Sequence, residues 1–391
     1  MIAKRIAAAV VAALVLFVSA VEALAYDVPV EKKVFTLPSY TTEGGRTIRN
    51  VRVGYETYGK LNAAGDNAIF IAHYFSGNSH AAGKYSPSDA APGYWDSIIG
   101  AGKPIDTDKY FVISADTLAN LNTKDPNVIT TGPASIDSDT GKPYAMTFPV
   151  VSYDDSVRVH RALVGSLGVK KLHAVAGASG GSIQAMIWAA LYPDLVERVV
   201  HVVGPGFDIS PYVLEMLDVW VLPIEMDPKW NQGDYYGRGE PVDGVAQALK
   251  IVTITAVANG WAEQKFGYKW TDPAKDPAAA MNNTYAIQSA LDKAGEARAK
   301  STDADSMIYT AKANQLYNLG DKVKAMKAKI LFVPASSDRI FPPELSERAA
   351  ARYRAQGGVA EVAVIQGDGG HLDGVFNVAR QGEVIRAFLA K

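Results

Sequence analysis

Short apolar runs alternate with amphipathic segments along most of the chain. Each apolar run is followed within a few residues by Gly, Asn, Asp or Ser, as is typical where a buried strand ends at the edge of an open sheet. The runs predict strands over residues 68–72, 110–114, 172–176, 196–203, 330–334 and 359–365. Helices are expected over residues 154–167, 183–191, 344–356 and 378–390. This alternation predicts an α/β fold with a mostly parallel central sheet.

The alternation stops between residue 206 and about residue 321. This stretch is helix-prone and rich in aromatic residues, and it holds four of the six Trp of the chain. Such large side chains need apolar contacts of their own. The 391 residues also exceed the ~250–300 at which a single core stops growing. We therefore expect a core in two segments, 26–206 and 321–391, with a helical cap inserted at 207–320.

The first 25 residues predict a secretory signal peptide. A cationic start at residues 1–5 precedes an apolar run over 6–18, and Ala-Leu-Ala at 23–25 has the small residues that a signal peptidase reads. Cleavage is expected before Tyr26, which predicts a secreted or periplasmic protein without stable membrane insertion. The alternative is a retained anchor, but the run is shorter than the ~20 residues that span a bilayer.

The amino-acid composition excludes several classes of functional site. The chain has no Cys, which excludes disulfides, thiolate metal sites and a cysteine nucleophile. Its net charge is −2 and no Lys/Arg block stands out, so nucleic-acid binding is not expected. It has no P-loop and no H-E-x-x-H motif, and we expect neither a cofactor nor a metal. The expected partner is a small molecule, and any covalent catalysis needs an oxygen or nitrogen nucleophile.

The sequence Gly-Ala-Ser-Gly-Gly at 177–181 matches G-x-S-x-G and identifies Ser179 as a candidate nucleophile. The motif alone is weak, because a Gly-rich turn is often only a turn. Here the strand expected at 172–176 runs into it and the helix expected at 183–191 leaves it. A nucleophile elbow needs that strand–turn–helix context, which exposes the serine hydroxyl above the sheet.

A serine hydroxyl needs a base, usually His. In α/β hydrolases the chain order is Ser, acid, His, and only His201 and His371 of the six His follow Ser179. His201 lies within an apolar run, whereas His371 lies just beyond the last expected strand. His371 is therefore the candidate base.

The third member should be a carboxylate that orients the imidazole. Asp338 follows the strand expected at 330–334 and is the favoured candidate, although an Asx turn or helix cap would also explain it. Asp368 and Asp373 are rivals because they lie close to His371 in sequence.

The oxyanion of a tetrahedral intermediate needs N–H donors that are already in place. The amide of Gly180, after the nucleophile, is one candidate. The amide of Phe75, in the loop after the strand expected at 68–72, is the second. Alternatively, this loop only ends the strand, or the donor lies one residue away.

Several further motifs, in the same order, resemble the homoserine O-acetyltransferase family, whose members have an α/β-hydrolase fold. The matching segments are Gly-Tyr-Glu-Thr-Tyr-Gly-Lys-Leu-Asn at 54–62, His-Tyr-Phe-Ser-Gly-Asn-Ser-His at 73–80, and the stretches 93–96, 105–113, 131–135 and 227–236. The resemblance covers nearly all of the chain after the signal. It implies Ser179 as nucleophile, Asp338 as acid and His371 as base, and it is compatible with a homodimer.

The chain also departs from the family pattern around the predicted pocket. Gly180 stands where the family's G-G-S-M-G-G elbow has Met, and Leu372 stands where an acidic residue commonly follows the histidine. Residues 119–130 replace a Gly-Cys-rich segment, and 302–307 differ from F-D-x-N-S-Y. These changes leave the acyl-transfer residues intact and alter the surroundings that would recognise homoserine and acyl-CoA.

The leading hypothesis is an exported serine esterase acting on a small-molecule ester through Ser179, Asp338 and His371. Acetyl-CoA is cytosolic, so an exported enzyme would not meet it. An O-acyltransferase that uses acyl-CoA or another acyl donor is the alternative, because the chemistry is shared up to the acyl-enzyme. A non-catalytic binding protein on a hydrolase scaffold is the alternative from another class.

Overall fold

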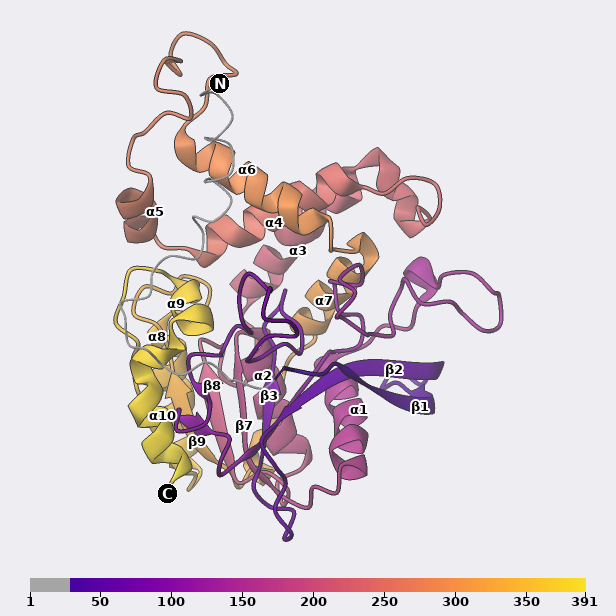
Figure 1. The fold of residues 1–391 in the computed structure, drawn as a ribbon, viewed down its shortest axis with the longest axis vertical. Coiled ribbons are helices and arrows are strands. Elements are labelled where there is room, and N and C mark those ends of the chain that lie inside the picture. The colour runs from indigo at the N-terminus through magenta and orange to yellow at the C-terminus, as the bar shows by residue number, and fades with distance from the viewer. Residues whose placement is uncertain (1–28) are drawn as a thin grey trace.

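A computed structural model describes residues 29–391, so the expected signal at 1–25 lies outside the described residues. Within them, eight strands form one twisted sheet in the order β1-β2-β6-β3-β7-β8-β9-β10 (Figure 1). The strands are β1 (Lys33–Thr41), β2 (Thr47–Tyr58), β6 (Phe111–Ala115), β3 (Ala68–Ala72), β7 (Leu172–Ala178), β8 (Arg198–Val202), β9 (Lys329–Val333) and β10 (Ala360–Val362). β2 runs antiparallel to both β1 and β6, and every other pair is parallel. The prediction of a mostly parallel α/β sheet is confirmed.

Helices cover both faces of this sheet. In β3, Phe70 belongs to a buried cluster with residues of α1, α2 and α8, while Ile69 and Ile71 belong to a second cluster with residues of α10. The helices of the core are α1 (Tyr153–Ser166), α2 (Gly180–Leu191), α8 (Pro343–Ala355), α9 (His371–Phe376) and α10 (Gly382–Leu389). Because both faces are buried, the central strands are continuous apolar runs in the sequence.

The helical cap lies between β8 and β9 in the chain and above one end of the sheet (Figure 1). Its helices are α3 (Pro211–Met226), α4 (Val242–Ala256), α5 (Asn259–Lys265), α6 (Ala286–Ala299) and α7 (Ala304–Gln315). Trp220 and Leu249 belong to an apolar cluster that also includes Phe75 and Ile340 from loops of the core. The cap therefore packs on the loops that leave the sheet. The expected bounds at 206/207 and 320/321 stay predictions.

The remaining elements are short. They are the parallel pair β4 (Ile99–Gly100) and β5 (Ile105–Asp106), and the 3-10 segments η2 (Ala145–Thr147), η3 (Pro228–Gly233), η4 (Gly320–Ala325) and η5 (Val378–Gln381). The final helix, expected at 378–390, is divided into η5 and α10. The hairpin of β1 and β2 was not predicted, because its buried or partly buried residues are interrupted by exposed ones and form no apolar run.

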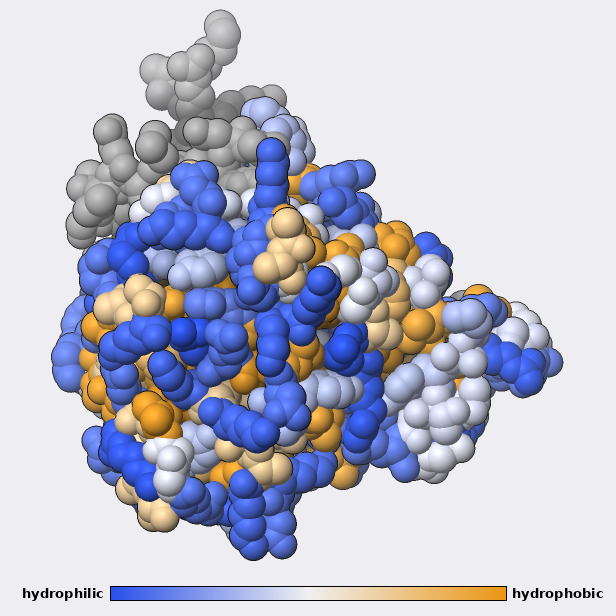
Figure 2. All heavy atoms as spheres, turned by 90° about the horizontal axis from the view of Figure 1, so that it is seen from below, coloured by the Kyte–Doolittle hydropathy of each residue, from blue (hydrophilic) through white to orange (hydrophobic). Residues whose placement is uncertain are grey.

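No helix within residues 29–391 has the length and apolar character needed to span a bilayer. On the face opposite the cap, hydrophilic residues predominate, with hydrophobic ones scattered among them (Figure 2). The catalytic candidates lie at the other end, where the parallel strands finish. This is where open α/β sheets commonly bind ligands.

Candidate active site

Ser179 occupies a sharp turn between β7 and α2. Its φ of 56° and ψ of −122° lie in a region that side chains rarely adopt, and such strain is characteristic of functional positions. The turn requires glycines, because a Cβ on Gly181 would lie 2.1 Å from the Ala72 carbonyl oxygen. The Ser179 amide donates to the carbonyl of Val202 at 3.0 Å, which anchors the turn to β8. These features are those of a nucleophile elbow.

Asp338 and His371 form a buried pair at the ends of the following strands. The His371 Nδ1–H donates to Asp338 Oδ2 at 2.8 Å. Asp338 Oδ1 accepts from the amides of Ile340 at 2.9 Å and Phe341 at 3.1 Å, so the carboxylate is held on both sides. His371 Nε2 is buried and has no hydrogen-bond partner among the described residues. A neutral imidazole that donates through Nδ1 keeps Nε2 as an acceptor for a proton.

The rival residues are engaged elsewhere. Asp373 accepts from the Gly369 amide at 2.8 Å, and Asp368 accepts from Gln264 Nε2 at 3.1 Å. His201 is fully buried in β8, and burial lowers its pKa to about 3, which keeps it neutral. The structure therefore places Asp338, and neither of the other two carboxylates, on the imidazole of His371.

Helix α9 brings His371 to the same edge of the sheet as Ser179. Gly374 of α9 packs so closely on Val203 that a Cβ there would lie 2.2 Å from Val203 Cγ1. Val203 directly follows Val202, whose carbonyl accepts from the Ser179 amide. No hydrogen bond joins Ser179 to His371 in the described part of the chain. Contacts of this kind are often long in unliganded enzymes, and the catalytic roles of the three residues stay predictions.

The Phe75 amide lies beside the elbow. A Cβ placed on Gly180 would be 3.5 Å from the Phe75 nitrogen. Within residues 29–391, neither the Phe75 amide nor the Gly180 amide donates to another residue. Gly180 begins α2, and the first amide of a helix lacks an intrahelical partner, whereas Phe75 lies in a loop. Both amides are therefore available to an oxygen bound above Ser179.

We call residues 73–80 the oxyanion loop. His73 holds its start, because Nδ1–H donates to the Tyr74 carbonyl at 2.9 Å and Nε2 accepts from Asn120 Nδ2 at 3.2 Å. Burial lowers the pKa of His73, which is consistent with this neutral tautomer. Asn120 Nδ2 also donates to the Gly77 carbonyl at 3.0 Å, and Asn122 Nδ2 donates to the Ser76 carbonyl at 3.1 Å. Two asparagine amides therefore position the loop that carries Phe75.

Sequence analysis did not single out Asn120 and Asn122. The available signal was their position, since both lie in the segment 119–130 that departs from the family pattern.

The structure also explains why Gly180 stands where the family has Met. A Cβ on Gly180 would lie 2.8 Å from the Tyr153 hydroxyl, which accepts from Asn314 Nδ2 at 3.0 Å. A methionine there would collide with Tyr153 in its present position.

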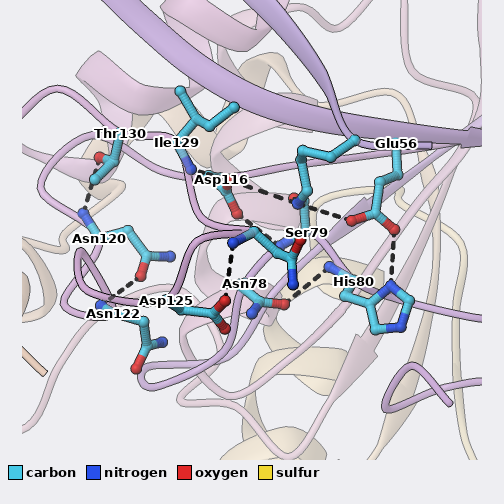
Figure 3. Close-up of polar contacts among 12 residues, drawn as sticks. Glu56, Asn78, Ser79, His80, Asp116, Asn120, Asn122, Asp125, Ile129 and Thr130 are labelled. Carbon is cyan, nitrogen blue, oxygen red and sulfur yellow. Dashed lines mark hydrogen bonds and ion pairs between the residues drawn. The ribbon is translucent and has the colours of Figure 1, made fainter. Parts of the chain in front are cut away.

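An ion cluster of Lys32, Glu56 and Asp116 supports the far end of the oxyanion loop. Figure 3 labels its two carboxylates and the loop residue Ser79. Lys32 Nζ lies 2.7 Å from Glu56 Oε1, 3.8 Å from Asp116 Oδ2, and in contact with Ser79 Oγ. Glu56 Oε2 also accepts from His80 Nδ1 at 3.0 Å. Burial raises the pKa of Glu56, but His80 and Lys32 outweigh it and bring this pKa below its usual value.

The cap contacts both loops of the candidate site. Arg298 Nη2 on α6 donates to Ser76 Oγ of the oxyanion loop at 2.9 Å. On the other side, the Trp261 amide donates to the Asp368 carbonyl at 3.1 Å, and a Cβ on Gly370 would lie 2.7 Å from the Ala258 nitrogen. The loop before His371 therefore packs directly on the cap backbone.

Comparison with known proteins places this site in a family. A model of the α/β-hydrolase fold matches residues 90–377. A Deferribacter desulfuricans protein named homoserine O-acetyltransferase is 35% identical over 362 residues, which cover 89% of this chain and 92% of that protein. The chain belongs to the homoserine O-acetyltransferase family of α/β-hydrolase-fold proteins. The resemblance to this enzyme family that the sequence motifs indicated is thereby confirmed.

Two solved structures of the family's fold carry different names. The crystal structure of esterase E22 has 46% sequence identity and a TM-score of 0.88, and the match covers 92% of this chain and all of that one. Homoserine O-acetyltransferase from Bacillus anthracis has 36% identity and the same TM-score of 0.88, with 93% and 98% covered. A Methanococcoides burtonii relative, also named homoserine O-acetyltransferase, is 36% identical, and this chain spans only 63% of its length.

Proposed function

We propose that this protein is a serine esterase that hydrolyses a small-molecule ester through an acyl-enzyme on Ser179. The observation that supports it is the hydrogen bonding of the His371 imidazole. Its Nδ1–H is bonded to a buried carboxylate, and its buried Nε2 has no partner among the described residues. Such an imidazole is oriented as a general base, and it lies at the strand ends that also carry the strained Ser179.

The residues divide the reaction into two steps. Ser179 Oγ attacks the ester carbonyl while His371 Nε2 takes its proton, and the amides of Phe75 and Gly180 bind the oxyanion. The imidazolium, stabilised by Asp338, returns the proton to the leaving alcohol. Water then attacks the acyl-serine with His371 again acting as base, which releases the acid and restores the Ser179 hydroxyl.

The proposal of water as acceptor rests on the surroundings of His371. Leu372 follows it directly and packs against the apolar cluster of the cap, where the family commonly has an acidic residue. An apolar side chain cannot accept a hydrogen bond from the polar groups of an acceptor substrate. The higher sequence identity to esterase E22, 46% against 36% for the Bacillus anthracis acetyltransferase, points the same way.

Acetyl transfer to homoserine is the second candidate. It is favoured by the curated relatives, since the Deferribacter desulfuricans and Methanococcoides burtonii proteins are both named for that activity. Acetyl transfer would use the same acyl-enzyme as ester hydrolysis. The two reactions differ only in the acyl donor and in the molecule that accepts the acyl group.

One pair of assays separates these readings. Purified protein is given p-nitrophenyl acetate, and separately acetyl-CoA with homoserine, with the Ser179→Ala variant as control. We expect ester hydrolysis that the substitution abolishes, without homoserine-dependent release of CoA. CoA release that requires homoserine would establish the transferase instead. A wild-type protein that forms no acyl-enzyme with any activated ester would indicate a binding protein.

We further propose that the protein is exported, on the basis of the pattern at residues 1–25. The full chain would be expressed in a Gram-negative host and the periplasmic fraction isolated. The expected product begins at Tyr26. Recovery of the uncleaved chain in the cytosol would contradict export and would bring acetyl-CoA back as an available donor.

A further inference from the structure

Arg298 is a mostly buried cation without a carboxylate. It extends from α6 of the cap, where Nη1 donates to Thr253 Oγ1 at 3.1 Å and Nη2 donates to Ser76 Oγ at 2.9 Å. Among residues 29–391, no Asp or Glu forms an ion pair with it. Burial lowers the pKa of this guanidinium, which nevertheless stays charged at any physiological pH.

The guanidinium retains donors for a ligand. Arginine has five N–H groups, and only two hydrogen bonds engage them here, both to neutral hydroxyl oxygens. The Thr253 hydroxyl already donates to the Leu249 carbonyl at 2.7 Å, so it acts only as an acceptor for the arginine. A buried charge without a counter-ion is unfavourable, and natural proteins rarely keep one unless something pairs with it.

Arg298 also contacts the loop that carries the Phe75 amide. Its partner Ser76 directly follows Phe75, whose amide lies beside Gly180 and hence beside the nucleophile. We infer that a group held by the free N–H donors is part of the molecule whose ester carbonyl lies over Ser179. The ligand chemistry that matches a guanidinium with several free N–H donors is a carboxylate, which it can bind through two parallel hydrogen bonds.

We propose that Arg298 binds a carboxylate of the substrate, so that the ester cleaved at Ser179 carries a negative charge in its acyl half or in its alcohol half. This proposal rests on the proposed acyl-transfer function of the site. It makes Arg298 a specificity-determining residue that the cap contributes to the core.

The test uses two matched pairs of esters. The acyl pair is p-nitrophenyl pentanoate and mono-p-nitrophenyl glutarate, and the alcohol pair is butyl acetate and 4-acetoxybutanoate. For the wild-type protein we expect kcat/KM to favour the anionic member of one pair by about 10-fold to 100-fold, as one charge-assisted interaction provides. The pair that shows the preference identifies the half of the substrate that carries the carboxylate.

Variants then assign the preference to Arg298. In Arg298→Met the ratio of kcat/KM values within the pair should fall to near one, and Arg298→Lys should keep part of it. Arg238→Met is the matched control, because Arg238 is an exposed cap arginine already paired with Asp234 at 2.5 Å. It should keep the wild-type ratio. Equal losses for both members of the pair in Arg298→Met would overturn the proposal and make Arg298 a structural support of Ser76.

Two further measurements keep the proposal falsifiable. If Arg298→Met does not fold, a wild-type protein that prefers the neutral ester in both pairs overturns the proposal by itself. If no ester is hydrolysed, the proposed function fails but the carboxylate site can still be tested. Glutarate should bind to the Ser179→Ala variant in calorimetry and should not bind to Ser179→Ala/Arg298→Met, and equal binding by the two variants would overturn it.

Discussion

The two ends of the oxyanion loop are each held by a mostly buried cation, and the two cations differ in their partners. At the core end, Lys32 contacts Ser79 and is neutralised by Glu56 and Asp116. At the cap end, Arg298 contacts Ser76 and has no carboxylate among the described residues. Lys32, with its counter-ions, holds the loop in place, whereas Arg298, without them, can bind an anionic ligand. The comparison separates the supporting end of the loop from the recognising end.

The cap holds a second ionisable side chain without an ion-pair partner among the described residues, the carboxylate of Asp305. Asp305 accepts from Trp230 Nε1 at 2.8 Å through one carboxylate oxygen, while Oδ2 is buried with no partner among the described residues. Burial raises the pKa of Asp305 to about 7 despite the Trp230 hydrogen bond, and the charge of Asp303 adds to the rise. Arg298 and Asp305 of the cap therefore both lack an ion-pair partner among the described residues.

The largest expected effect is at the core end. Glu56→Gln removes the main partner of Lys32 and leaves a buried ammonium poorly compensated, so the free energy of unfolding should fall by about 3 kcal/mol or more. Urea unfolding followed by tryptophan fluorescence measures it. Asp139→Asn is the control, because this carboxylate pairs with Arg49 at an exposed site and should cost less than about 1 kcal/mol. Equal effects would show that the core cluster does not stabilise the loop.

The next effect is a pH dependence caused by Asp305. Its folded pKa of about 7 lies above the unfolded value of about 3.9, so the folded state binds more protons between these pH values. Its contribution to stability is therefore fully present below about pH 4 and is lost as the pH rises through 7. The loss is on the order of 4 kcal/mol in all, of which roughly 2–3 kcal/mol falls between pH 5 and pH 8. Unfolding at pH 5 and pH 8 should show a smaller difference in Asp305→Asn than in the wild type. An unchanged difference would contradict the assignment.

A smaller effect should follow from loosening the middle of the oxyanion loop. Asn122→Ala removes the donor to the Ser76 carbonyl but leaves both oxyanion amides in the chain. We expect kcat for p-nitrophenyl acetate to fall about tenfold with little change in KM, which is less than the loss of an oxyanion donor itself. The exposed Asn282→Ala variant should match the wild type. A change confined to KM would mean that Asn122 contributes to binding and not to the geometry of the loop.

The smallest effect should be on the stability of Arg298→Met. No carboxylate is left unpaired by this change, so the free energy of unfolding should shift by less than about 1 kcal/mol. The same urea experiment as for Glu56→Gln applies. A loss as large as that of Glu56→Gln would remove the contrast between the two ends of the loop.

Continuous apolar runs were the most informative signal for the fold. The strand predicted at 68–72 has the same bounds in the structure, and 172–176 extends to β7 (Leu172–Ala178). β1 and β2 were missed because a half-exposed antiparallel hairpin has no such run. The six-residue helix α9 (His371–Phe376) is too short to show a period, so no helix was predicted at His371, which begins one.

Side-chain chemistry was predictable where a motif fixes the order of residues. Ser179, Asp338 and His371 were identified from their positions after strands, and the structure brings the last two into contact. The support of the oxyanion loop was not predictable, because it depends on backbone carbonyls accepting from Asn120 and Asn122. Arg298 was missed as well, since an arginine in a polar helix is indistinguishable from an exposed one until the packing is known.

The contact of Gly370 and Asp368 with the cap backbone has an evolutionary consequence. Because a Cβ at Gly370 would lie 2.7 Å from the Ala258 nitrogen, this junction leaves no room for a side chain at residue 370. Recombination between relatives that exchanged the cap alone would bring foreign backbone against the loop that carries His371. We therefore expect an exchanged cap to work best when residues 73–80 and 367–371 are exchanged with it, although these lie in three separate stretches of the gene.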